Sequence, residues 1–200
     1  FKVITMSAGI DSGAITPETT YTDTGEVTLN GKTIHNWDLK SYGTVTMTRV
    51  IERSLNTGAV FAQRAMGQKT FYDYMVKFGF KEKKGIDLPG EIVGSLNPLE
   101  DDIREINYAT ASFGQGISVT PVGLLSAISA IANDGVMMRP YLNAEQGPEE
   151  IRRVISPETA RKVQEMMVSA VNKAEIPRIR GYSVAGKTGT AQVVALKDDD

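Results

Sequence analysis

Residues 181–188 read Gly-Tyr-Ser-Val-Ala-Gly-Lys-Thr, which matches the phosphate-binding pattern G-x-x-x-x-G-K-T letter for letter. This pattern restricts the fold, because a phosphate loop follows a buried parallel strand and opens a helix whose first amides hold the phosphates. Here the preceding segment, residues 173–180, is charged and contains Pro177. Residues 189–196 are partly β-branched and predict a strand where the helix should begin. The surroundings therefore disfavour a nucleotide-binding fold.

Residues 187–189 also spell Lys-Thr-Gly, one of three motifs that a class of serine acyl-transfer enzymes combines in one site. The other two are Ser-x-x-Lys and Ser-x-Asn, and both precede Lys-Thr-Gly in the chain. Ser54-Leu55-Asn56 supplies the second motif, at a predicted junction between two helices. Each triplet alone arises by chance in many chains. Together, in this order and with the second triplet on a predicted strand, they are a more specific signal.

The composition limits the chemistry that such a site could use. The chain has no cysteine and one histidine, His35, which excludes thiolate metal sites and makes a Ser-His-Asp triad implausible. A formal net charge of -2 gives no reason to expect a nucleic-acid partner. We therefore expect no metal and no cofactor, and any acid–base chemistry must rest on Lys, Ser, Asp, Glu or Tyr.

The length of 200 residues fits a single domain. No apolar run approaches the ~20 residues that cross a bilayer. Hydrophobic spacing and turn residues predict small strands and loops in residues 15–37. Helices are predicted over residues 2–10, 46–66 with an interruption at 54–58, 68–78, 98–111, 120–132 and 156–172.

The last two predicted helices have clear start signals, because Thr120 and Ser156 are good N-caps and each precedes a proline. The side chains expected to face the core are Leu124, Leu125, Ile128 and Ile131 in the first of them, and Ala160, Val163, Met166, Met167 and Ala170 in the second. His35 and Trp37 are expected to be buried loop anchors rather than site residues.

With their surroundings, the two triplets resemble the transpeptidase domain of penicillin-binding proteins, in particular the class B enzymes. The phrase FGQGISVTP, followed by a helix and then AGKTGTAQ, is the most specific part. The resemblance implies an α+β fold of the β-lactamase/transpeptidase type, with a helical subdomain and part of the antiparallel sheet. The segments that carry it are residues 1–6 (FKVITM), 54–59 (SLNTGA), 113–121 (FGQGISVTP), 130–135 (AIANDG) and 185–192 (AGKTGTAQ).

The resemblance implies a peptidoglycan D,D-transpeptidase that cross-links stem peptides through a serine acyl-enzyme and binds β-lactam antibiotics. Lys2 is similar to the lysine of Ser-x-x-Lys and would act as general base, with a pKa lowered by burial and neighbouring cations. Ser54 would relay a proton to the departing D-alanine. Asn56 would bind Lys2 and the amide carbonyl of the substrate.

The same resemblance assigns residues 187–190 to the substrate. Lys187 would raise the local positive potential and attract the substrate carboxylate, which the Thr188 and Thr190 hydroxyls would hold. Gly189 would let an extended peptide or a β-lactam lie against the strand. The backbone N–H of Thr190 would form an oxyanion hole together with the N–H of the nucleophilic serine.

The chain departs from the family pattern at both ends. No lysine has a serine three residues before it, so the nucleophile would lie two places before Phe1. We therefore expect residues 1–200 to be a partial transpeptidase domain, inactive alone, that lacks the nucleophile segment and the C-terminal strands and helix. The resemblance implies the extracytoplasmic face of the bacterial membrane and, through missing regions, a membrane glycosyltransferase partner. The alternative is a non-catalytic β-lactam- or peptide-binding or sensor module of the same fold.

Overall fold

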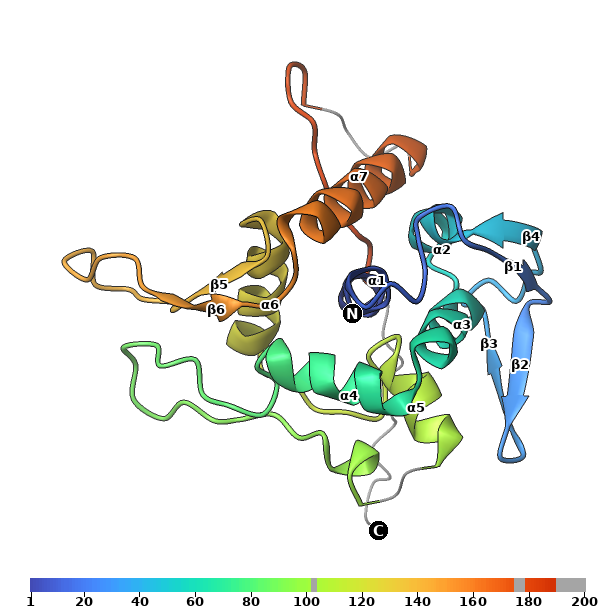
Figure 1. Ribbon diagram of the computed structural model, residues 1–200, viewed down its shortest axis with the longest axis horizontal. Helices are drawn as coiled ribbons and strands as arrows, with labels where there is room; N and C mark the ends of the chain where they lie inside the picture. Colours follow the sequence, from blue (N-terminus) through green and yellow to red (C-terminus); the bar gives the residue numbers. More distant parts are fainter. Residues whose placement is uncertain (102–103, 175–178, 190–200) are drawn as a thin grey trace, which may run out of the picture.

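Helix α1 (Lys2–Asp11) lies at the centre of the molecule, with α3, α4, α6 and α7 around it. Figure 1 shows this arrangement in the computed structural model, which describes residues 1–101, 104–174 and 179–189. Residues 3–10 are buried on every side of α1. Its polar side chains are satisfied internally, since the Thr5 hydroxyl donates to the Ser112 carbonyl at 2.6 Å and the Ser7 hydroxyl to the Val3 carbonyl at 2.8 Å. Such a helix serves as the core against which the others pack.

The remaining helices follow the sequence signals closely. Thr46, Thr120 and Ser156 each accept a hydrogen bond from the amide three residues later, as N-caps do. The predicted helix at residues 98–111 is instead two pieces, a short 3-10 helix and α5. The elements are α2 (Met47–Arg53), α3 (Asn56–Met66), α4 (Gln68–Lys77), η1 (Asn97–Leu99), α5 (Glu105–Ala111), α6 (Pro121–Ala132) and α7 (Pro157–Lys173).

The predicted interruption near residues 54–58 is confirmed, and it falls at Ser54 and Leu55, between α2 and α3. Gly58 lies inside α3 rather than in the junction. A Cβ at this position would stand 2.2 Å from Val50 Cγ2, so the glycine lets α3 approach α2 closely. The two helices that border the junction are therefore packed directly against each other.

Three antiparallel strand pairs complete the described part of the chain. Strand β1 (Thr20–Asp23) pairs with β4 (Gly43–Thr46), and β2 (Glu26–Leu29) forms a hairpin with β3 (Lys32–His35). These four strands lie together beside α2 and α3 (Figure 1). The third pair, β5 (Val136–Met138) with β6 (Glu150–Arg153), lies beside α6. The architecture is thus mixed, with helices around α1 and antiparallel pairs at the edge.

Two expectations about burial were wrong. Leu125 is 65% exposed, although Ile131 on the same helix is buried. Trp37 is 64% exposed and His35 is also exposed, so neither is a buried anchor. On α7 the predicted core-facing side is confirmed. All five residues expected there are buried, namely Ala160, Val163, Met166, Met167 and Ala170. In the part of the chain that the structure describes, every helix is too short or too polar to span a bilayer.

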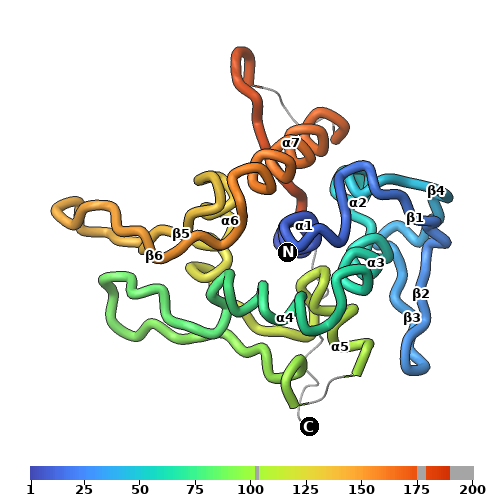
Figure 2. Tube along the Cα trace, viewed as in Figure 1, coloured from blue at the N-terminus to red at the C-terminus, as the bar shows by residue number. Residues whose placement is uncertain are grey.

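The segment after α7 carries the Lys-Thr-Gly triplet and crosses α7 on its way toward α1 (Figure 2). The Gly186 amide donates to the Met167 carbonyl of α7 at 3.4 Å, and a Cβ at Gly186 would stand 3.0 Å from Val171. Residues 182–189 are neither helix nor strand, and they pair with no strand of the described chain. The strand predicted over residues 189–196 lies outside the described residues beyond Gly189.

Candidate active site

Lys2 and Ser54 meet although 52 residues separate them in the chain. The Lys2 Nζ donates to the Ser54 Oγ at 3.3 Å. Lys2 stands in the first turn of α1, and Ser54 is the C-cap of α2 in the left-handed conformation, with φ 58° and ψ 43°. This conformation is uncommon for a residue other than glycine, and strained backbone of this kind clusters at functional sites. The reversal at Ser54 ends α2 and lets α3 begin two residues later.

Asn56 is the first residue of α3, so it stands on the same junction as Ser54. Its side-chain Nδ2 donates to the His35 carbonyl at 2.8 Å, and its backbone amide donates to Asn36 Oδ1 at 2.9 Å. The predicted bond between Asn56 and Lys2 is not among the contacts of the described residues. Asn56 is half-buried. It lies near the Lys2–Ser54 pair because only Leu55 separates it from Ser54 in the sequence.

The turn after α5 forms the surface beneath Lys2. The Phe113 ring centroid lies 5.8 Å from Lys2 Nζ, within cation–π range. Gly114 has φ 88°, and a Cβ there would stand 2.6 Å from the Cβ of Phe1. Gly116 also has a positive φ, 75°. These two glycines allow a tight turn, and Gly114 lets the start of α1 lie against it.

Lys187 enters the site from the segment that follows α7. Residues 186–188 border a small cavity together with Ile51 and Glu52 of α2 and with the last turns of α7. The Lys187 Nζ donates to the Thr188 carbonyl at 2.9 Å and lies 3.1 Å from the Thr188 hydroxyl. Thr188 and Gly189 are exposed. Thr190 lies outside the described residues.

The two lysines share an electrostatic environment. Burial, and secondly the positive charge of Lys187, lower the pKa of Lys2 from 10.5 to about 8. Burial alone lowers the pKa of Lys187 from 10.5 to about 8. A pKa in this range leaves a sizeable fraction of Lys2 uncharged near neutral pH, so that its amine can accept a proton. The site thus has a poised base in hydrogen-bond contact with a serine hydroxyl.

The lowered pKa of Lys2 can be measured by NMR titration of its side-chain amine in the 200-residue chain. We expect a midpoint at about 8. Replacing Lys187 by glutamine removes a like charge, so the Lys2 midpoint should move upward, toward 10.5. Lys69→Gln, which removes a lysine whose side chain is 88% exposed, serves as the control and should leave the Lys2 midpoint unchanged. A Lys2 midpoint that ignores the Lys187 substitution would contradict the electrostatic coupling.

Several residues of the site were missed at the sequence level. The Asn36 side chain and the His35 carbonyl hold Asn56, and the Phe113 ring faces Lys2. One signal could have indicated the first of these contacts. Leu55 stands at the N-cap of α3 and has no side chain that can cap it, so the first amides of this helix require an acceptor from elsewhere.

The chain is similar to known proteins in both sequence and structure. The model of the family described as "Penicillin binding protein transpeptidase domain" matches residues 1–200. Stage V sporulation protein D of Bacillus subtilis is 34% identical over 97% of this chain and 32% of its own length. Peptidoglycan D,D-transpeptidase FtsI of Escherichia coli is 31% identical over 83% of this chain and 28% of its own length. The chain therefore spans about a third of the length of these relatives.

The fold is similar to that of the transpeptidase domain of penicillin-binding protein 3 from Burkholderia pseudomallei, solved in its apo form. The TM-score is 0.83 at 31% sequence identity, and the match covers 100% of this chain and 62% of that one. The expected α+β fold of the β-lactamase/transpeptidase type is thereby confirmed. The family match also decides against the phosphate-loop interpretation of residues 181–188, which the surrounding sequence already disfavours.

Proposed function

Because the chain belongs to the transpeptidase-domain family of penicillin-binding proteins, we propose that it forms part of the active site of a peptidoglycan D,D-transpeptidase. The observation that carries this proposal is the contact between the Lys2 amine and the Ser54 hydroxyl, at 3.3 Å. It joins a base whose pKa is lowered to about 8 to a hydroxyl that can pass a proton onward.

The chemistry that this pair supports is acyl transfer to a serine. The nucleophile would be a serine two positions before Phe1, one helical turn from Lys2. Its Oγ attacks the carbonyl carbon of the penultimate D-alanine, and its proton passes to the Lys2 amine. When the tetrahedral intermediate collapses, the C–N bond breaks and the leaving D-alanine amine takes a proton through Ser54. The acyl-enzyme then transfers the peptide to the amine of a second stem peptide, which restores the serine.

The other residues would bind the substrate around this path. Asn56 would bind the amide carbonyl of the donor peptide and contact Lys2. Lys187 would attract the terminal carboxylate and, by its charge, keep Lys2 neutral. The Thr188 and Thr190 hydroxyls would hold that carboxylate. Gly189 would leave room for the peptide, and the Thr190 amide would complete the oxyanion hole.

We also propose a ligand, a cellular location and a partner enzyme for the protein. The name of the family supports β-lactam binding, because a β-lactam would enter the site in the place of the stem peptide. The peptidoglycan substrate implies the extracytoplasmic face of the bacterial cytoplasmic membrane. A membrane glycosyltransferase is the proposed partner, since cross-linking must follow synthesis of the glycan strands. Residues 1–200 would then be one portion of the transpeptidase domain.

Covalent labelling with a fluorescent penicillin tests the function in the complete gene product that contains residues 1–200. We expect a labelled band on a denaturing gel and its loss when Lys187 is replaced by alanine, because the positive potential at the site disappears. The matched control is Lys69→Ala, which removes an exposed lysine on α4 and should label as before. Reversible binding without an adduct would refute catalysis and leave a binding or sensor module.

A further inference from the structure

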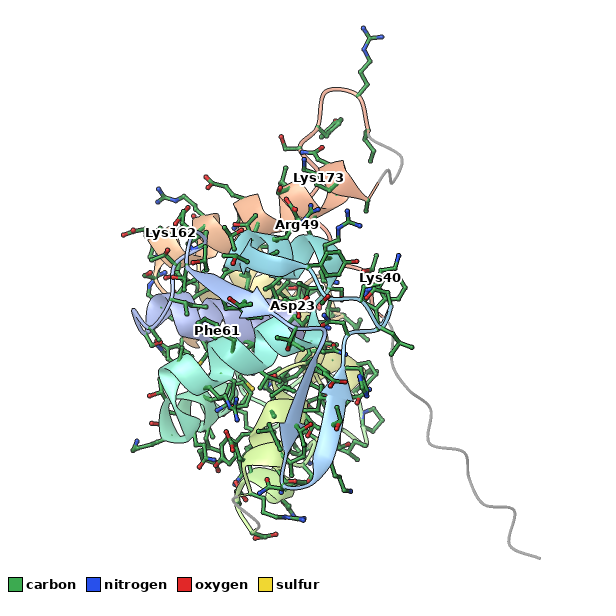
Figure 3. All side chains as sticks on the ribbon, turned by 90° about the vertical axis from the view of Figure 1, so that its right-hand side faces the viewer. Asp23, Lys40, Arg49, Phe61, Lys162 and Lys173 are labelled. Carbon is green, nitrogen blue, oxygen red and sulfur yellow. The ribbon has the colours of Figure 1, made fainter. Side chains whose placement is uncertain are left out.

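A buried polar cluster lies directly behind the α2–α3 junction. Asp23 at the end of β1, Asn36 after β3 and Thr57 in the first turn of α3 are 2%, 1% and 7% exposed. Figure 3 shows Asp23 where the strands meet α3, with Lys40 close by. Buried polar groups are costly unless their hydrogen bonds are made, and a fully bonded cluster fixes its members rigidly. The cluster is therefore a rigid support for whatever it touches.

Asn36 caps α3 from a distance of 20 residues in the chain. Its Oδ1 accepts hydrogen bonds from the Asn56 amide at 2.9 Å and from the Thr57 amide at 3.3 Å. These are first-turn amides that a helix cannot satisfy internally, and Leu55 at the N-cap offers no acceptor. The backbone of Asn56 is thus fixed by a side chain of another element.

Asp23 determines which way the Asn36 amide points. The Asn36 Nδ2 donates to both Asp23 carboxylate oxygens, at 3.1 and 3.0 Å, and to the Lys40 carbonyl at 3.1 Å. A flipped amide would place its oxygen against these three acceptors and its NH₂ against the amides of α3. Asp23 is itself held by the Gly25 amide, the Tyr42 amide and, at 2.7 Å, the Thr57 hydroxyl.

The Asn56 side chain is held by the neighbour of Asn36. Its Nδ2 donates to the His35 carbonyl at 2.8 Å, and the backbone amide of Asn36 donates to the Gly25 carbonyl at 2.9 Å. One hydrogen of the Asn56 amide is thereby used, which leaves its second hydrogen and its Oδ1 in a fixed direction. Residues 35 and 36 therefore set both the backbone and the side-chain orientation of Asn56.

We propose that Asn36, oriented by Asp23, is a positioning residue that presents the Asn56 amide to the substrate. This inference rests on the proposed function, in which Asn56 binds the donor peptide. Asn36 touches no substrate and acts through the first turn of α3. Loss of its amide frees that turn and lets Asn56 leave its productive orientation, and a small misplacement of a positioning group costs about 100-fold in rate.

The positioning is tested first without reference to activity, in the 200-residue chain with ¹⁵N-labelled asparagine. In the wild type we expect the Asn56 side-chain NH₂ to be ordered on the picosecond–nanosecond timescale, and in Asn36→Ala to approach a free side chain. The matched control is Asn133→Ala, since Asn133 Nδ2 also donates to a backbone carbonyl, that of Val136, away from the cluster. An ordered Asn56 side chain in folded Asn36→Ala overturns the proposal.

The second arm measures penicillin acylation rates in the complete gene product. Asn36→Ala should acylate about 100-fold more slowly than wild type. In an Asn56→Ala background the same substitution should change the rate less than about threefold, because residues that act as a unit are not additive. Losses that multiply in the double variant would assign Asn36 a general structural role and overturn the proposal. A wild type that fails to label refutes the proposed function, while the NMR arm still decides the positioning.

A milder pair of variants covers the case in which Asn36→Ala does not fold. Thr57→Val keeps the volume and removes the hydroxyl bonded to Asp23, whereas Thr57→Ser keeps the hydroxyl. Thr57→Val should acylate about tenfold more slowly and loosen the Asn56 side chain, because the Thr57 hydroxyl hydrogen-bonds Asp23, Asn36 and Tyr21. Thr57→Ser should stay within about twofold of wild type. Equal rates and equal Asn56 order in the two variants overturn the proposal.

Discussion

Lys2→Arg should slow acylation by penicillin about 10²–10⁴-fold, the range for loss of a general base. Arginine keeps the positive charge and most of the length of the side chain, but its guanidinium does not lose a proton in proteins. Lys2 does so readily, because burial and the charge of Lys187 lower its pKa to about 8. The measurement is the acylation rate of the complete gene product with a fluorescent penicillin, before and after the substitution.

The pH profile separates this explanation from a structural one. If neutral Lys2 takes the serine proton and charged Lys187 holds the substrate, the wild-type rate rises with pH as Lys2 deprotonates and falls again as Lys187 loses its charge, with both pKa values at about 8. In Lys2→Arg this rise should vanish. Lys69→Arg, on an exposed site, is the control and should keep the wild-type rate and profile. A Lys2→Arg variant with the wild-type pH profile would exclude Lys2 as the base.

Local signals in the sequence were sufficient for most of the helices. Thr120 and Ser156 cap α6 and α7 as predicted, because an N-cap depends on residues only three positions apart. The face of α6 was harder to predict. Its residues are apolar nearly all round, so periodicity does not select one side, and Leu125 faces solvent while the small Ala127 and Ala130 are buried. Packing against the rest of the protein therefore determines which face of α6 is buried.

The candidate site likewise contains residues that the sequence predicted and residues that only the fold brings together. A motif identified Ser54 and Asn56, the family resemblance identified Lys2, and the structure brings the three to one junction. Their proposed roles in catalysis remain predictions. The support of Asn56 by Asp23 and Asn36 depends on strand pairing and helix docking across the chain, which no local pattern encodes. Trp37 was misjudged for a similar reason. Its apolar ring suggested burial, but its Nε1 donates to the Arg53 carbonyl at 3.0 Å and leaves the ring exposed.

Stability rests on the core rather than on the site. Phe71 of α4 is fully buried, and its ring meets that of Tyr108 edge-on at 6.3 Å between centroids. Phe71→Ala should lower the free energy of unfolding by about 3–5 kcal/mol, since it removes the buried ring and leaves a cavity. For a chain of this size each kcal/mol shifts Tm by about 2–4 °C. Thermal unfolding followed by circular dichroism measures the loss.

The graded variant Phe71→Leu fills most of the cavity and should cost less than Phe71→Ala. The pKa of Lys2 provides an independent readout of the site, because burial of its own amine and the charge of Lys187 determine it. In folded Phe71→Ala it should therefore remain at about 8, although the protein unfolds at a lower temperature. A Lys2 pKa that returns toward 10.5 in the folded variant would show that the packing of α4 controls the desolvation of the base. Core and site would then be coupled through α1, the helix that both share.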